Sequence, residues 1–147
     1  MQRLPSLTRW TIATALFVCI TACPRRVEIQ LVGQEEAGRP VFDVVPIGPG
    51  NPNYLGDFTV TACEKFDGTA RSANWFIIGS APVERFVYGK VPAGYVAHGY
   101  MTGPIVSQGE VEPLPEGCYV ANTGGSGSLR FTVSRDGSVL LKPTVTR

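Results

Sequence analysis

The chain is poor in the side chains that carry catalysis and metal binding. It has one histidine, His98, and four cysteines among 147 residues. A hydrolytic triad needs a histidine beside a nucleophile and an acid, and the chain has no G-x-S-x-G sequence. Zinc sites need clustered histidines and cysteines, and no EF-hand spacing indicates calcium. We therefore expect no catalytic activity, no metal and no other cofactor.

Strong charge and long apolar runs are missing too. Thirteen Lys and Arg residues stand against 12 Asp and Glu, for a net charge of +1. Nucleic-acid-binding domains usually carry a basic patch, so we expect no nucleic-acid partner. The apolar run from Trp10 to Ile20 is about half the ~20 residues that a membrane-spanning helix needs. After residue 22, no segment keeps helical apolar spacing over three turns.

What is present begins at the amino terminus. Arg3 and Arg9 precede the apolar run, and small residues follow it before Cys23. A basic region, a short apolar region and small residues before a cleavage site predict a secretory signal. Without Arg3 and Arg9, 11 basic residues remain against 12 acidic ones.

The sequence Ile20-Thr21-Ala22-Cys23 resembles the bacterial lipobox. In that family the cysteine thiol is lipidated, the signal is cut before it and the new amino terminus is acylated. The resemblance implies a signal peptide over residues 1–22, a lipidated tether over 23–26 and one domain over 27–147. Pro24 replaces the Asp of an inner-membrane retention signal, which implies the periplasmic face of the outer membrane. The alternative is an ordinary signal peptide, with Cys23 buried or in a disulfide.

The lipoprotein interpretation also sorts the cysteines. Cys19 leaves with the signal and Cys23 takes the lipid, which leaves Cys63 and Cys118 in an oxidising compartment. We predict a disulfide between these two, with a pair of buried free thiols as the alternative. Cys63 lies on the opposite strand face from Phe58, so we expect it at a strand end, at a bulge or on a covered face.

Residues 27–31 alternate apolar and polar at period two, whereas residues 73–78 are apolar on both faces, which suits a central strand covered on both sides; glycine- and proline-rich turns separate such segments. A turn is expected over 33–38, a loop over 48–56, and an edge strand or loop over 91–100. Asp136-Gly137 predicts a hairpin with a tight primed turn. The expected strands are 27–31, 41–45, 57–66, 73–78, 83–88, 117–121, 129–133 and 139–141. Such short strands predict an all-β fold, a single antiparallel β-sandwich with Greek-key links, with a small β-barrel as the alternative.

Two further resemblances concern the fold and the location. Leu114-Pro115-Glu116-Gly117-Cys118-Tyr119-Val120 looks like the strand entry of transthyretin-like and immunoglobulin-like sandwiches. The mature part also resembles small uncharacterised bacterial lipoproteins, at Trp75 with Ile77, at 88–95, at 113–114 and at 117–120. These resemblances imply a β-sandwich in the cell envelope and no particular activity.

The residues of most interest for binding are Tyr95, His98 and Tyr100. Pro92, Gly94 and Gly99 interrupt this stretch, so we expect the three side chains to stand free of the core. Tyrosine rings offer apolar faces with a polar tip, which suits protein or glycan surfaces.

We therefore expect a non-catalytic binding or structural module, anchored to the membrane by its lipid, with a protein or an envelope polymer as partner. The alternative is a periplasmic inhibitor of a hydrolase such as lysozyme. An enzyme acting on envelope polymers is the third hypothesis, and the scarcity of acid–base residues disfavours it.

Overall fold

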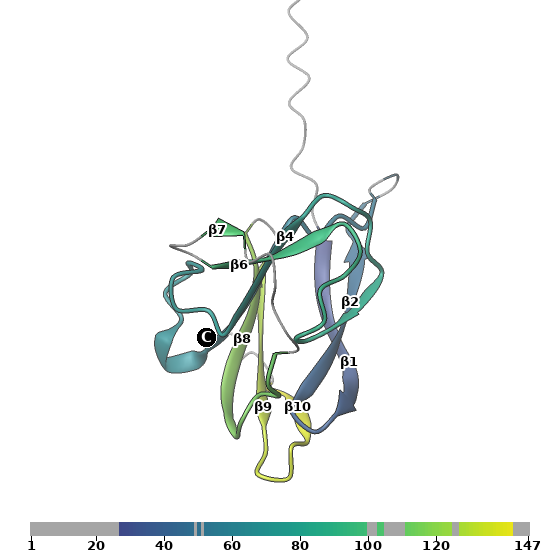
Figure 1. Ribbon diagram of the computed structural model, residues 1–147. Helices are drawn as coiled ribbons and strands as arrows, with labels where there is room; N and C mark the ends of the chain where they lie inside the picture. The colour runs from purple at the N-terminus through teal and green to yellow at the C-terminus, as the bar shows by residue number, and fades with distance from the viewer. Residues whose placement is uncertain are drawn as a thin grey trace, which may run out of the picture.

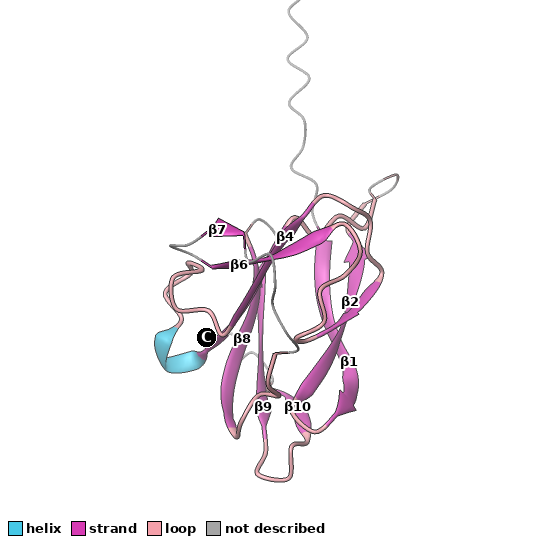
Figure 2. Ribbon diagram, viewed as in Figure 1, coloured by secondary structure: helices cyan, strands magenta, loops and turns pink. Residues whose placement is uncertain are grey.

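The computed structural model describes residues 27–48, 50, 52–99, 103–104, 111–124 and 127–142. Strands dominate this part of the chain, and the helical content is one 3-10 turn, η1 (Cys63–Lys65) (Figures 1 and 2). The strands are β1 (Val27–Glu36), β2 (Arg39–Pro46), β3 (Asp57–Ala62), β4 (Trp75–Gly79), β5 (Arg85–Val87), β6 (Tyr95–Gly99), β7 (Gly103–Pro104), β8 (Gly117–Thr123), β9 (Gly127–Val133) and β10 (Val139–Leu141).

The strands form two antiparallel sheets. The smaller has the order β1-β2-β5, and the larger has the order β10-β9-β8-β3-β4-β6-β7. The chain crosses between the sheets after β2, after β4 and after β5. The two sheets pack face to face and do not close on each other, so the all-β sandwich is confirmed over the barrel.

The core between the sheets is aromatic. Phe42 from the smaller sheet has its ring centroid 5.2 Å from that of Phe58 and 5.9 Å from that of Phe131, both in the larger sheet. The ring centroid of Phe58 also lies 4.8 Å from that of Phe86 in β5 and 6.1 Å from that of Trp75. All five rings are buried, three of them with no exposed surface. Edge-to-face and tilted ring pairs of this kind hold the sheets together beyond what simple burial supplies.

β3 is covered on both faces. Phe58 and Val60 face the core, while Thr59 and Thr61 face the other way and are only 4% and 0% exposed. Cys63 follows directly in the 3-10 turn, so it lies at a strand end, as predicted. Its disulfide with Cys118 is confirmed, with 5.3 Å between the two Cα atoms and 55 residues between them in sequence.

The predicted ends of β1 and β3 are each wrong by four residues or more, whereas the limits of the other expected strands differ by less. β1 does not turn at Gly33 but continues to Glu36, because register shifts between Leu31 and Gly33 and between Gln34 and Glu36 absorb the extra residues. β3 ends at Ala62 rather than at residue 66, because a turn closed by the Phe66 N–H and the Cys63 carbonyl replaces the ladder.

The hairpin between β9 and β10 is present, but its turn differs from the predicted primed type. The Gly137 N–H donates to the Ser134 carbonyl at 2.8 Å, and Ser134 and Ser138 close the ladder. Gly137 has φ +82°, whereas no described non-glycine residue, Asp136 included, has positive φ. The loop is therefore a three-residue connection with its left-handed residue in third place.

Candidate functional site

Tyr95 is the predicted binding residue that the structure places most clearly, and its expected exposure is wrong. Its side chain is 6% exposed and belongs to the core. Its hydroxyl donates to the Ala81 carbonyl at 2.8 Å and accepts from the Leu55 N–H at 3.1 Å. Burial raises the pKa of Tyr95 above its usual range. Tyr95 fastens two loops to the sheet and does not face solvent.

His98 lies on the opposite face of the same strand. Residues 95 and 98 are three apart in β6, so their side chains point to opposite sides of the sheet. The half-buried His98 ring packs edge-on against Phe76 of β4, with 5.3 Å between centroids. Tyr100 and Cys23 lie outside the described residues. The predicted trio is therefore not one surface.

A different set of side chains surrounds His98. Ile78 pairs with Val96, and Phe76 stands opposite His98, so all four share the outer face of the larger sheet. Val96 is 49% exposed, and the other three are half-buried. We call Phe76, Ile78, Val96 and His98 the β4–β6 patch. The signal for it was the run Trp75-Phe76-Ile77-Ile78, which is apolar on both faces of the strand, while the glycines and prolines around β6 obscured the partner strand.

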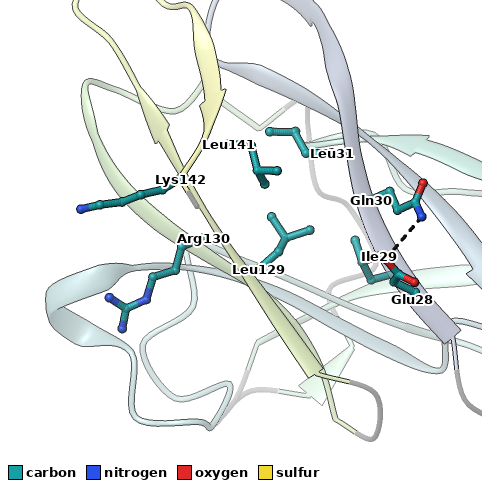
Figure 3. A pocket seen from close by; sticks show the side chains of 8 residues that line it. All are labelled: Glu28, Ile29, Gln30, Leu31, Leu129, Arg130, Leu141 and Lys142. Carbon is teal, nitrogen blue, oxygen red and sulfur yellow. Dashed lines mark hydrogen bonds between the residues drawn. The ribbon is translucent and has the colours of Figure 1, made fainter. Parts of the chain in front are cut away.

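The second candidate surface is a groove at the side of the sandwich. It has a volume of about 370 Å³ and lies between β1 and the β9–β10 edge. In Figure 3 the apolar side chains Ile29, Leu31, Leu129 and Leu141 converge on it, while Arg130 and Lys142 point away. We call it the β1–β10 groove. A smaller hollow continues it along Gly127 and Ser128.

Both strands that border the β1–β10 groove are sheet edges in the described part of the chain. β1 pairs with β2 alone, and β10 pairs with β9 alone. One end of the groove is closed where the Val139 N–H donates to the Gln34 side chain at 2.7 Å. Unpaired edges beside an apolar groove are the arrangement to which an added extended segment can pair.

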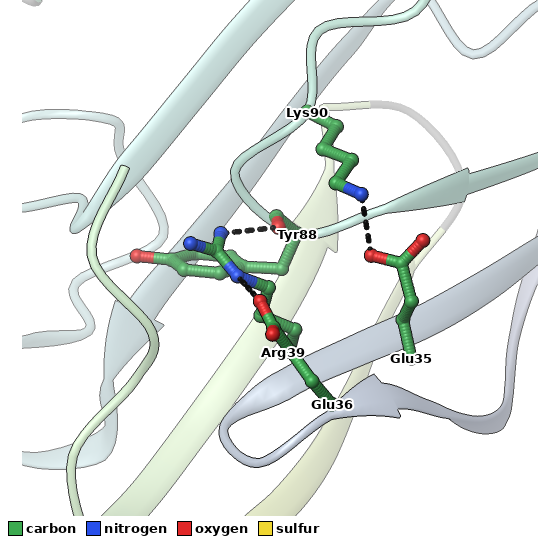
Figure 4. A network of polar contacts seen from close by, with 5 residues as sticks. All are labelled: Glu35, Glu36, Arg39, Tyr88 and Lys90. Carbon is green, nitrogen blue, oxygen red and sulfur yellow. Dashed lines mark hydrogen bonds and ion pairs between the residues drawn. The ribbon is translucent and has the colours of Figure 1, made fainter. Parts of the chain in front are cut away.

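A buried polar network lies at the turn between β1 and β2 (Figure 4). Arg39 is 4% exposed; it pairs with Glu36 and donates to the Tyr88 carbonyl at 3.4 Å. Lys90 pairs with Glu35 at 2.6 Å near the surface. Burial raises the pKa of Tyr88 to about 12, the nearby Tyr119 adds to the rise, and Arg39 opposes it. This network ties the β1–β2 hairpin to the chain that follows β5.

The described residues contain no group of three or more His, Cys, Asp or Glu side chains able to hold a metal ion. Within the same residues, no helix has the length and apolar character needed to span a membrane. Comparison of the chain with protein-family models, with curated proteins and with solved structures finds no match.

Proposed function

We propose that the protein is a bacterial lipoprotein, acylated at Cys23, whose β-sandwich acts as a non-catalytic binding module at the periplasmic face of the outer membrane. One observation carries the proposal. The lipobox-like Ile20-Thr21-Ala22-Cys23 ends four residues before Val27, where β1 begins. Cleavage before Cys23 would therefore remove no residue of the sandwich.

Lipid at Cys23 would hold the domain firmly. Each buried methylene contributes about 0.8 kcal/mol, and stable anchoring takes two membrane signals, which the three acyl chains of this family exceed. No transmembrane helix would be needed in addition.

A four-residue tether would keep one end of the sandwich close to the membrane. Four residues span at most about 14 Å, so the sandwich end that carries Val27 and Pro46 would lie next to the bilayer. β1 has 10 residues and extends about 33 Å, so the turn at its far end would lie up to that much farther from the membrane. At that end the Gly38 N–H donates to the Gly137 carbonyl at 2.9 Å, which joins the two hairpin turns.

The β4–β6 patch is the surface we propose for binding. It combines an exposed valine, an isoleucine, an aromatic ring and an imidazole on one sheet face. Aromatic and aliphatic side chains of this kind serve as anchors at protein interfaces. His98 thus keeps its predicted binding role, with Phe76 and Val96 beside it in place of Tyr95.

Cross-linking in the native envelope, followed by capture of the protein, tests this function. Val96→Asp places a charge in the β4–β6 patch, and Val91→Asp is the matched control because Val91 is 40% exposed outside the patch. We expect Val96→Asp to lose the captured partner at an unchanged melting temperature, while Val91→Asp keeps it. Equal capture by both variants would exclude the patch. Protection of a lysozyme substrate would instead favour the inhibitor hypothesis, and turnover of peptidoglycan an enzyme.

A further inference from the structure

The two ends of the sandwich differ in charge. At the end where β1 begins, the connections over residues 46–56, 79–83, 92–94 and 124–127 contain no Asp, Glu, Lys or Arg. We call this the uncharged end. At the opposite end, the connections that follow β3 and β9 contain Glu64, Lys65, Asp67, Arg71, Arg135 and Asp136.

Hydrogen bonds between its connections hold the uncharged end in one arrangement. The Val83 N–H donates to the Asn53 carbonyl at 2.9 Å, and the Asn53 side chain donates to the Val44 carbonyl at 3.1 Å. Tyr54 forms an antiparallel bridge with Pro82. These contacts join the connection before β3 to the connection before β5. A surface held in this way can meet a partner without first being ordered.

The outer face of β2 changes from charged to apolar toward the uncharged end. Asp43 pairs with Arg85 at 2.6 Å, and two residues further on Val45 is 36% exposed. Ile47, the residue after β2, is 47% exposed. Glu28 of β1 stands opposite Val45, so charged groups begin at that level of the sheet. The exposed side chains nearest the end of the strand are therefore apolar.

We propose that Val45 and Ile47 insert into the lipid bilayer and thereby set the orientation of the sandwich on the membrane. The inference rests on the lipid anchor proposed above, because a tether of four residues keeps this end within about 14 Å of the bilayer. Exposed aliphatic side chains gain free energy when they leave water for the acyl-chain boundary. The carboxylate of Glu28 limits the insertion to a shallow depth.

The charge pattern also decides the kind of lipid contact. Clusters of Lys and Arg adsorb to anionic headgroups, and that attraction weakens as the salt concentration rises. The connections of the uncharged end contain no basic residue, so the contact depends on burial of apolar surface. We therefore expect it to persist at high salt and to need no anionic lipid.

Paramagnetic relaxation in lipid nanodiscs tests the proposal. The acylated protein, purified from bacterial membranes, is placed in phosphatidylethanolamine nanodiscs that hold a small fraction of lipid with a spin-labelled headgroup. We expect the amide NMR signals of Val45 and Ile47 to be lost through broadening. The signal of Leu140, which is 58% exposed near the β9–β10 turn, should remain.

A pair of variants separates insertion from mere proximity. Ile47→Asp should restore the Val45 signal, because a charge at this position opposes burial in the bilayer. Leu140→Asp, which adds the same charge at an exposed position toward the opposite end, is the matched control and should leave the broadening unchanged. Equal melting temperatures of the two variants and the wild type verify that all three are folded.

Mass spectrometry of the same samples distinguishes the two ways in which the inference can fail. Absence of acyl chains at Cys23 would overturn the lipid anchor and the insertion together. Acyl chains at Cys23, with Val45 broadened as strongly in Ile47→Asp as in the wild type, would overturn the insertion alone, since the tether would then suffice to position the domain. Broadening that disappears at high salt would also overturn the insertion of apolar side chains.

Discussion

The hydroxyl of Tyr95 donates a hydrogen bond to the carbonyl oxygen of Ala81 at 2.8 Å. The Tyr95 hydroxyl oxygen also accepts a hydrogen bond from the N–H of Leu55, which is 5% exposed. One side chain in β6 thereby satisfies backbone groups from the loop before β3 and from the connection between β4 and β5. We expected Tyr95 to be a recognition residue, but in the fold its hydroxyl joins two loops to the sheet.

Removal of this hydroxyl should therefore destabilise the domain. In Tyr95→Phe the Leu55 N–H stays buried without its partner, which costs about 1–3 kcal/mol. Tyr119→Phe is the matched control, because the Tyr119 hydroxyl donates to the Pro115 carbonyl at 2.9 Å and no described backbone N–H donates to it. Urea unfolding measures both. A Tyr95→Phe variant no less stable than Tyr119→Phe would contradict this role.

The error over Tyr95 has a clear physical origin. Pro92, Gly94 and Gly99 suggested an irregular stretch, but the irregularity is confined to a turn at Ala93-Gly94, where Gly94 has φ +80°. From Tyr95 onward the chain pairs with β4, and the ladder decides which side chains are buried. Tertiary pairing thus overrode the local signal.

Tyr88 should make the protein sensitive to alkali. Its pKa in the folded state is about 12, above the ordinary value of 10.0, so the unfolded chain releases this proton first. The contribution of Tyr88 to the free energy of unfolding is fully present below pH 10. It is lost between pH 10 and 12, by about 1 kcal/mol for each pH unit. Urea unfolding of the wild type and Tyr88→Phe at pH 7, 10 and 11 checks this. The variant should lose less stability than the wild type on going from pH 10 to 11, and parallel losses would disprove the assignment.

Glu35 and Glu36 are neighbours with unequal partners. Glu36 pairs with the Arg39 guanidinium, whose side chain is 5% exposed, whereas Glu35 pairs with Lys90, which is 50% exposed. Glu36→Gln should cost about 1–2 kcal/mol because it leaves a buried cation less well compensated. Glu35→Gln should cost less than about 0.5 kcal/mol. Thermal unfolding of the two variants compares the pairs directly, and equal losses would argue against a special role for Arg39.

The disulfide should contribute measurably to stability. Cys63 and Cys118 close a loop with a sequence separation of 55 residues, for which loss of the bond costs about 2–4 kcal/mol. A Cys63→Ser, Cys118→Ser double variant should show this loss in urea at unchanged pH. Intact mass after alkylation without reductant provides the check on the wild type. Alkylation of both cysteines there would show that the pair is reduced.

The sequence predicted features that depend on local pattern. Period-two alternation located several strands, and Cys63 and Cys118 were paired because only these two thiols would remain after the expected cleavage and lipidation. The β1–β10 groove could not be predicted from the sequence. It forms where the edges of two sheets meet, and these edges are more than 90 residues apart along the chain. The length of β1 was missed because pairing with β2 holds its second half in a ladder despite Gly33.

The proposed location and function both depend on acylation at Cys23, which metabolic labelling with a palmitate analogue detects. Cys23→Ala should give an unlabelled, uncleaved precursor that still carries residues 1–22. Cys19→Ala, which changes a cysteine outside Ile20-Thr21-Ala22-Cys23, is the matched control and should be labelled and processed like the wild type. Label that persists in Cys23→Ala would contradict the lipoprotein assignment, and the proposed location would fall with it.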